Sequence, residues 1–374
     1  MGTDPVTLFL CGDVMLGRGV DQILPHPGDP TLREPYLRDA RDYVEAAEAV
    51  GGPIPRPVPY AWPWGDALAL LDRAAPDVRV LNLETSVTRS DDFAPGKEVH
   101  YRMDPANLPC LAEARPDVCA LANNHVLDFG VRGLQETLAA LADARLTAVG
   151  AGWDAQEARR PAVVEVGGDR RVLVFSFGTA SSGISWTWAA ADAVPGVDFV
   201  SEASSADAAA VVDRVRRAKQ PGDIVVASVH WGSNWGYRIP REQVRFAHAL
   251  IDGGVDVVHG HSSHHPRPVE VYRGRIILYG CGDFIDDYEG ITGHEQYRDD
   301  LRLLYFVSVD PGSGELADAW AAPVQTRQLR LRHASAEDAQ YLRDVLDRVS
   351  HGFGVRVDPG PDGTLVLRPA RNRA

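Results

Sequence analysis

Long apolar runs, paired cysteines and secretion signals are all missing from this chain of 374 residues. No apolar stretch reaches the roughly 18 residues that a membrane-spanning helix needs. The segment Met1–Cys11 has neither a basic start nor a small-residue cleavage site, so we predict no signal peptide. The 4 cysteines form no Cys-x-x-Cys pair, which predicts reduced, mostly buried thiols. We therefore expect a cytoplasmic protein without a membrane partner.

Positive charge is also scarce. The chain has 38 Lys and Arg residues against 52 Asp and Glu, a net charge of −14, and only Lys97 and Lys219 are lysines. A protein with this charge repels polyanions, so we expect no nucleic-acid partner. A long anionic polymer is an equally poor match unless a metal ion supplies local positive charge.

Apolar segments of strand length alternate with segments of helical periodicity, which is typical of an α/β protein. The predicted strands are Val6–Cys11, Val78–Leu83, Val118–Ala122, Arg171–Phe177, Ile224–Val229 and Val255–Val258. The predicted helices are Gly133–Ala144, Ser204–Lys219, Arg241–Gly253 and Ser335–Ser350. We expect a main domain over residues 1–325 and a small C-terminal appendage of helix and strand, residues 326–374, packed on it.

Polar side chains that can bind a metal or carry a proton follow five of these strands. In open α/β sheets, ligands bind at the carboxyl ends of the strands. The candidate ligands are Asp13, Glu84, Asn124, His230 and His261. Their oxygens suit Ca, Mn or Mg, while the imidazoles favour Mn, Fe or Zn, and the absence of cysteine argues against a structural zinc site. The sequence predicts a site for one divalent metal ion, and no nucleotide cofactor, because it contains no phosphate-binding glycine fingerprint.

The order of these motifs resembles a known family from about residue 6 to residue 310. The motifs are Gly12-Asp13-Val14-Met15-Leu16-Gly17-Arg18, Asn82-Leu83-Glu84-Thr85, Ala122-Asn123-Asn124-His125 with Asp128 and Gly130, His230-Trp231-Gly232, Gly260-His261 with His264, and Tyr279 with Gly282-Asp283-Phe284. They resemble the CapA-like, poly-gamma-glutamate synthesis-like branch of the calcineurin-like metallophosphoesterase superfamily. The resemblance implies a calcineurin-like four-layer αββα sandwich, with two packed sheets flanked by helices and metal ligands after the strands.

The chain departs from the superfamily pattern at three of these motifs. Met15 stands where the first motif has a histidine, and the second motif has Glu84 with no aspartate at Val87. The last motif has one extra residue between His261 and His264. A two-metal centre needs ligands for both ions about 3.5–4 Å apart, so these losses favour a single ion.

Candidate acid/base groups lie beside the predicted ligands. They are His125, Asp128, His264, Asp283 and His294. Histidine exchanges protons near pH 7, and a carboxylate can fix its tautomer. Asp128 is alternatively a helix cap, and His294 is alternatively a solvated loop residue. Two acid/base groups and a cation that holds a developing enolate are what an epimerase needs.

Three residues are candidates for contact with a substrate: Arg18, Trp231 and Trp235. Arg18 can anchor a substrate carboxylate or form a structural ion pair, and each tryptophan can instead be part of the packing. A cleft lined with tryptophan suits a peptide or an aromatic side chain better than a phosphate ester.

Three functions are compatible with these patterns. The chain is similar to the branch of CapA-like proteins found in lasso-peptide gene clusters, which implies a metal-dependent peptide epimerase acting in the biosynthesis of ribosomally made, modified peptides. Its expected substrate is a precursor peptide whose C-terminal residue, a tryptophan, is inverted at Cα. The alternatives are a metallophosphoesterase or poly-gamma-glutamate-processing hydrolase, and a non-catalytic metal-dependent protein that binds a peptide or polymer.

Overall fold

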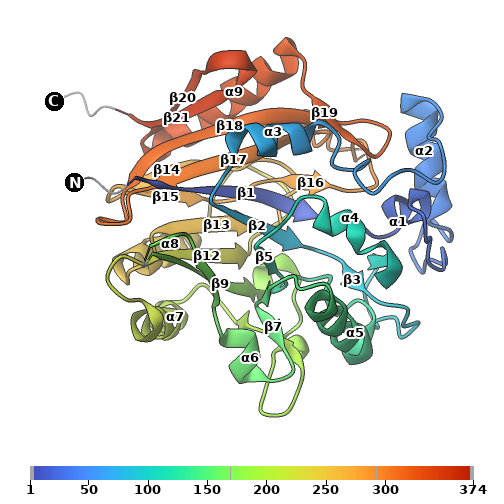
Figure 1. Cartoon of the computed structure of the whole chain (residues 1–374), viewed down its shortest axis with the longest axis horizontal. Helices are drawn as coiled ribbons and strands as arrows, with labels where there is room; N and C mark the ends of the chain where they lie inside the picture. The colour runs from blue at the N-terminus through green and yellow to red at the C-terminus, as the bar shows by residue number, and fades with distance from the viewer. Residues whose placement is uncertain (1–3, 169, 292, 371–374) are drawn as a thin grey trace.

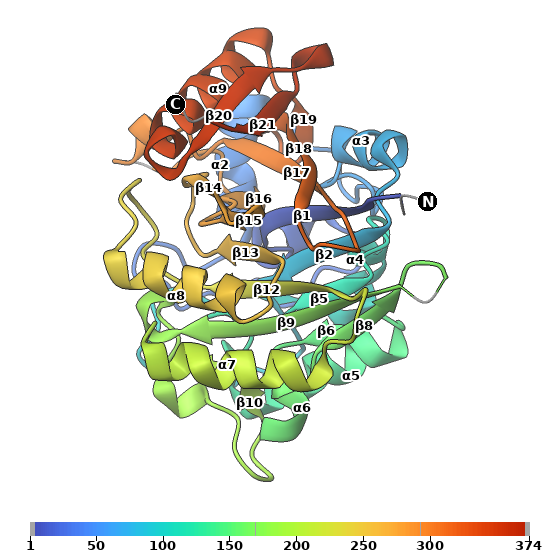
Figure 2. The same ribbon diagram turned by 90° about the vertical axis from the view of Figure 1, so that its left-hand side faces the viewer.

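The computed structural model describes residues 4–168, 170–291 and 293–370. Within these ranges two large β-sheets stack face to face, and helices cover the outer face of each sheet (Figures 1 and 2). This arrangement is the four-layer αββα sandwich that the sequence predicts.

The first sheet has ten strands in the described part of the chain. Its path is β20 (Val355–Pro359), β21 (Leu365–Pro369), β18 (Leu316–Thr326), β17 (Leu301–Val309), β1 (Val6–Val14), β2 (Val78–Leu83), β5 (Val118–Ala120) and β6 (Ala148–Val149). Two further strands pair with this path: β16 (Asp283–Ile285) lies parallel to β1, and β19 (Leu331–His333) lies antiparallel to β18. Because β1, β2, β5 and β6 are parallel, their carboxyl ends share one edge.

The second sheet has seven strands in the described ranges. Its path is β11 (Phe199–Val200), β9 (Arg171–Thr179), β12 (Ile224–His230), β13 (Val257–His261), β15 (Arg275–Leu278) and β14 (Val269–Tyr272), with β8 (Ala162–Glu165) beside β9. Strands β9, β12, β13 and β15 are parallel. Two small pairs lie outside both sheets: β3 (Ser86–Val87) with β4 (Arg102–Met103), and β7 (Ala151–Gly152) with β10 (Gly196–Val197).

Apolar side chains fill three layers. One core lies between the sheets and contains Leu8 of β1 and Val226 of β12. A second core joins the first sheet to α1 (Gly19–Ile23), α2 (Arg41–Gly51), α3 (Asp66–Ala74), α4 (Pro109–Ala112) and α5 (Gly130–Asp143). A third joins the second sheet to α7 (Ser205–Ala218) and α8 (Arg241–Asp252), while the short α6 (Ala155–Arg159) lies beside β7. The central strands are buried on both faces, and for that reason they read as continuous apolar runs.

The C-terminal segment adds to the first sheet. Strand β21 pairs with β18, and β20 pairs with β21. Helix α9 (Ala336–Ser350) packs on β20, with Leu342 and Leu346 in the core between the sheets. Figure 2 shows this segment above the strands of the main sandwich.

The predicted strands and helices are present, with ends that shift by a few residues. Ser204 and Ser335 cap α7 and α9 by accepting hydrogen bonds from the backbone N–H groups of Asp207 and Asp338. One difference concerns β13, which continues through His259–His261, beyond the predicted end of this strand at Val258. They stay in the strand because parallel pairing with β12 continues as far as His261 opposite His230.

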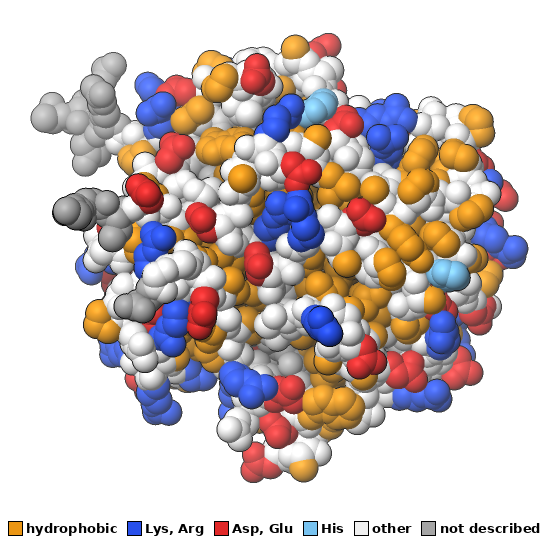
Figure 3. Space-filling view, viewed as in Figure 1, with side chains coloured by type: hydrophobic (Ala, Val, Ile, Leu, Met, Phe, Trp, Pro, Cys, Tyr) orange, Lys and Arg blue, Asp and Glu red, His pale blue; other side chains and the backbone are white. Residues whose placement is uncertain are grey.

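Two further expectations concern thiols and membranes. All four cysteines are buried and free, as predicted. In the described ranges, no helix combines the length and apolarity required to cross a bilayer. Acidic and basic side chains are interspersed on the face shown in Figure 3, so the net negative charge is not gathered on that face.

Gly12 permits a close approach that brings β1 and β16 together at the edge of the first sheet. Pairing between β1 and β2 is irregular from Leu10 to Asp13, and a Cβ on Gly12 would lie 1.5 Å from the carbonyl oxygen of Gly282. No side-chain rotation can relieve a clash with backbone. The position of Asp13 therefore depends on a glycine at this point of the strand.

We expect Gly12→Ala to lower the free energy of unfolding by about 3 kcal/mol or more, because β1 and the segment before β16 must separate. Urea denaturation followed by circular dichroism measures the change. Gly352→Ala is the matched control, since a Cβ there meets no atom within 4 Å, and its effect should stay within about 0.5 kcal/mol. Equal stability of the two variants would contradict the close approach.

Candidate metal centre and active-site cavity

Three buried side chains converge where the strands of the two sheets end. Asp13 lies in β1, His230 ends β12 and His261 ends β13. One ligand atom from each lies within 4.8 Å of the other two, a cluster found by considering the described residues only. The Nδ1 atoms of His230 and His261 are 2.8 Å apart, and Asp13 Oδ1 lies 4.0 Å from His261 Nδ1. The structure thus brings three of the five predicted ligands into one metal-binding geometry.

The other two predicted ligands border this cluster. Glu84 Oε1 lies 3.7 Å from His230 Nε2, and Asn124 Oδ1 lies 2.9 Å from the same nitrogen. The side-chain amide of Asn82 donates to Asp13 Oδ1 at 2.7 Å and to Glu84 Oε2 at 2.9 Å. Asn82 therefore holds the two carboxylates side by side.

The cluster has the electrostatics of a cation site. Burial and the charge of Asp283 raise the pKa of Asp13 to about 7, and burial and Asp13 raise the pKa of Glu84 well above its ordinary value. Burial also lowers the pKa of both His230 and His261, which stay neutral. Carboxylates without a countercharge and imidazoles with free lone pairs are the donors that a divalent cation requires. The residues present fit such an ion, with oxygen and nitrogen donors in one set.

His125 and Asp128 form the first acid/base pair. His125 Nδ1 lies 2.7 Å from Asp128 Oδ2, and this oxygen also accepts the backbone N–H of Tyr101 at 2.7 Å. Lys97 Nζ bonds the other oxygen of Asp128 and lies 3.3 Å from His125 Nδ1. Helix α5 starts at Gly130 with no side-chain cap. The capping alternative for Asp128 is therefore wrong, because its carboxylate is already used by these three partners.

Burial has the largest effect on the pKa of His125. It lowers the pKa of His125 to about 4; the carboxylate of Asp128 opposes this shift and the Lys97 ammonium adds to it. Burial alone would raise the pKa of Asp128, but His125 and Lys97 hold it below its ordinary value. His125 is therefore a neutral imidazole with Nδ1–H on Asp128 and a free Nε2, which lies 3.8 Å from Glu84 Oε1.

His264 and Asp283 form the second pair, in which the pKa of the histidine is shifted in the opposite direction to that of His125. His264 Nδ1 lies 3.0 Å from both oxygens of Asp283, and the hydroxyl of Tyr288 donates to Asp283 Oδ2 at 2.6 Å. Burial disfavours the imidazolium, but Asp283 outweighs it and raises the pKa of His264, while His264 keeps the pKa of Asp283 low. Two histidines whose environments separate their pKa values are suited to act as base and acid.

His294 lies behind this pair. Its half-buried ring stacks on Trp235 with centroids 3.9 Å apart, and Trp235 also contacts His264, with ring centroids 5.1 Å apart. In the described part of the chain, His294 makes no hydrogen bond to Asp283. The structure therefore places His294 and Trp235 beside the second pair and not within it.

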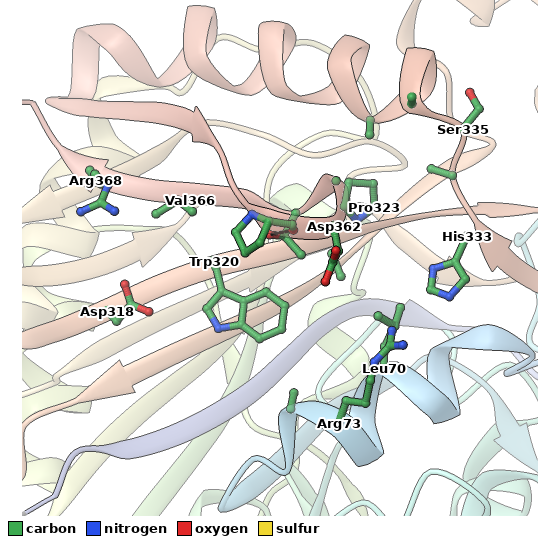
Figure 4. A pocket seen from close by; sticks show the side chains of 18 residues that line it. Leu70, Arg73, Asp318, Trp320, Pro323, His333, Ser335, Asp362, Val366 and Arg368 are labelled. Atoms are coloured by element: carbon green, nitrogen blue, oxygen red, sulfur yellow. Dashed lines mark hydrogen bonds between the residues drawn. The ribbon is translucent and has the colours of Figure 1, made fainter.

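A cavity of about 610 Å³ gives access to the site. Glu84, Asn124, His125 and His264 line it, together with aromatic and apolar side chains: Met15, Tyr36, Tyr43, Val99, Tyr101, Tyr288 and Ile291. A larger hollow of about 890 Å³ lies elsewhere, between α3, β18, α9 and β21 around Trp320 (Figure 4). It contains none of the predicted site residues.

The two remaining substrate candidates lie in different surroundings. Arg18 lines the cavity, but its guanidinium bonds Asp287 and Glu34 and lies between the rings of Tyr43 and Tyr101. This is the structural ion pair that the sequence left open. Trp231 is 2% exposed, stacks on Tyr279 and donates its Nε1–H to the Tyr279 carbonyl, so it belongs to the core under α8.

Comparison with known proteins places the chain in a family. The profile described as "Bacterial capsule synthesis protein PGA_cap" matches residues 7–288. The chain belongs to this family. It is 55% identical to a probable polyglutamine synthesis accessory protein of Mycobacterium tuberculosis over 370 residues, covering 99% of this chain and 97% of the relative.

Other relatives are more distant. The chain is 27% identical to the PGA biosynthesis protein CapA of Bacillus subtilis over 338 residues, covering 87% of this chain and 76% of the relative. A phosphatase structure from Mycoplasma pneumoniae superposes with a TM-score of 0.47 and 11% identity, covering 87% of this chain and 95% of the other. The family profile and the sequence relatives confirm the CapA-like assignment made from the motifs.

Sequence reasoning missed three residues of the candidate site. Asn82 bridges two carboxylates, Tyr288 bonds Asp283, and Lys97 bonds the first pair. A signal for Lys97 was present, because it is one of two lysines in a chain that otherwise uses arginine. Tyr288 carried no such signal.

We expect Lys97→Met to raise the pKa of His125 from about 4, because removing a neighbouring positive charge makes the imidazolium easier to form. NMR titration of ¹⁵N-histidine-labelled protein measures the shift. His259 is an internal control: burial lowers its pKa to about 4 and Lys97 contributes nothing to that value. An unchanged His125 in a folded variant would refute the role of Lys97.

Proposed function

We propose that this chain is a divalent-cation-dependent hydrolase that cleaves glutamyl amide bonds during the formation of a glutamate polymer. One observation carries the proposal: a cluster of Asp13, His230 and His261 that can hold a cation lies beside two histidine–carboxylate pairs that border one cavity, with the pKa of His125 lowered and that of His264 raised. The names of the family and of its relatives, which refer to capsule synthesis, PGA biosynthesis and polyglutamine synthesis, support an amide-linked polymer as the substrate class.

The residues divide the proton transfers between them. A cation held by Asp13, His230 and His261 would polarise a carbonyl oxygen and make water more acidic. His125 is a neutral imidazole whose Nε2 is free, and it can take a proton from a water molecule in the cavity. Asp128 stabilises the imidazolium that results. His264, charged beside Asp283, can give a proton to the departing amine.

The charge of the protein limits the form of the substrate. With a net charge of −14, the protein repels a long polyanion along most of its length. The cavity of about 610 Å³ holds a short segment only, and the Arg18 charge is already neutralised by Asp287 and Glu34. We therefore propose a short glutamyl segment or a chain end as the substrate.

Hydrolysis of short γ-glutamyl oligomers by the Mn²⁺-loaded protein tests this function, with new amines counted by mass spectrometry. We expect His125→Gln to lower kcat by about 10²–10⁴-fold while Mn²⁺ binding persists, because the general base is lost. His248→Gln is the matched control, since His248 lies on α8, bonds Glu270 and does not line the cavity. Turnover of a phosphodiester in place of the oligomer, also lost in His125→Gln, would contradict the amide substrate.

A second function is favoured by the separate origins of the two histidine pairs. His125 reaches the cavity from the loop after β5 and His264 from the loop after β13, so one can remove a Cα proton and the other can return one. We propose, as the alternative, a metal-dependent epimerase of a lasso-precursor peptide that ends in tryptophan.

The same preparations distinguish this alternative in heavy water. Chelator-sensitive gain of one dalton at a single Cα, without cleavage, supports the epimerase and contradicts the hydrolase. Tight peptide binding with neither cleavage nor exchange would overturn both enzymes and leave a binding protein.

A further inference from the structure

His259 connects the two sheets just below the metal centre. It points to the same side of β13 as His261, because alternate residues of a strand share a face. Its Nε2 lies 2.7 Å from the carbonyl oxygen of Cys11 in β1. That carbonyl falls in the irregular stretch of β1 between Leu10 and Asp13, where regular pairing with β2 is interrupted.

The Cys11 carbonyl fixes the tautomer of His259. A carbonyl oxygen only accepts hydrogen bonds, so Nε2 of His259 must carry the ring proton. His259 is fully buried, and its Nε2 bonds a backbone carbonyl and not a carboxylate. A buried imidazole without a countercharge stays neutral, so Nδ1 is an acceptor. The hydroxyl oxygen of Ser228 in β12 lies 3.2 Å from this nitrogen, so Ser228 donates its proton to His259.

The direction in which the Ser228 hydroxyl donates its proton then fixes the tautomer of His261. Ser228 Oγ also lies 2.9 Å from His261 Nε2. Since its one proton points to His259, Oγ can only accept from His261, whose Nε2 must carry the ring proton. The lone pair of His261 Nδ1 consequently faces His230 Nδ1 at 2.8 Å and Asp13 at 4.0 Å.

We propose that Ser228 and His259 are positioning residues of the metal centre: a relay from the Cys11 carbonyl through His259 and Ser228 keeps the proton of His261 on Nε2 and leaves Nδ1 free to bind the cation. The relay rests on the cation site of the proposed function, and it is independent of the substrate and the reaction. It assigns a role to a histidine that is fully buried and lies outside the ligand cluster.

Two measurements on the full chain test the relay. Isothermal titration with Mn²⁺ should show Ser228→Ala binding about 10- to 100-fold more weakly than the unsubstituted protein, the usual effect of losing a partner of a metal ligand. Ring ¹⁵N shifts of the zinc-loaded, ¹⁵N-histidine-labelled protein should show His261 protonated at Nε2 and bound through Nδ1. This signature does not depend on activity.

Ser176→Ala is a matched control. Ser176 lies on β9 directly opposite Ser228 and is also buried. Its hydroxyl has no hydrogen-bond partner among the described residues. We expect this variant to keep the Mn²⁺ affinity and the His261 shifts of the unsubstituted protein, so a loss confined to Ser228→Ala cannot come from removing a buried hydroxyl in general.

A double variant tests whether the two residues act in one chain. His259→Phe removes the acceptor of the Ser228 proton, so the hydroxyl can turn toward His261, and Mn²⁺ binding should weaken. The pair Ser228→Ala and His259→Phe should bind no more weakly than Ser228→Ala alone, because the relay is already broken.

Three outcomes distinguish failure of the relay from failure of the metal site and of the proposed reaction. Equal Mn²⁺ affinity and equal His261 shifts in Ser228→Ala and Ser176→Ala, with melting temperatures showing both folded, would overturn the relay and leave the metal site intact. Failure of the unsubstituted protein to bind Mn²⁺, Zn²⁺ or Ca²⁺ would overturn the metal site of the proposed function and the relay with it. Normal metal binding without hydrolysis would overturn the proposed reaction only.

Discussion

Two carboxylates that share one buried amide determine the character of this site. Asn82 donates to both Asp13 and Glu84, and neither of these two acidic residues is more than 5% exposed. Like charges at this separation cannot both ionise in a low-dielectric interior without a countercharge. The close contact of β1 with β16 adds Asp283 to the same region. The fold thus concentrates acidic groups where a cation, a proton or a charged histidine must compensate them.

The two histidine–carboxylate pairs differ in the charged groups that surround them. His125 has a carboxylate partner whose charge is shared with Lys97, so burial prevails and the ring stays neutral. The partner of His264 also accepts the hydroxyl of Tyr288, and the nearby Asp13 and Asp286 add negative charge, so the carboxylates outweigh burial and the imidazolium is favoured. The difference between the two histidines therefore lies in the charges around each pair: Lys97 beside His125, and Asp13 and Asp286 near His264.

Much of this arrangement follows from local sequence. Buried strands appear as apolar runs, and the polar residue that ends each run marks the edge where the ligands gather, which located Asp13, His230 and His261. The roles of Lys97, Tyr288 and Arg18 depend on loops that return to the site from elsewhere in the chain, and no local periodicity encodes that path. Trp231 was assigned to the site in error. It was a candidate for substrate contact because it directly follows a predicted ligand in the sequence, but its side chain packs in the core under α8.

Met15 links the family resemblance to the shape of the cavity. It stands where the superfamily motif has a histidine, and the structure places it in the cavity wall with its backbone N–H bonded to the Ile285 carbonyl. A thioether is a poor ligand for a hard cation but a good apolar contact. Together with Tyr43, Tyr101 and Ile291, it adds apolar surface to a cavity that charged groups also line. Such a wall can hold the carbon skeleton of a peptide-like substrate while its polar end faces His125 and His264.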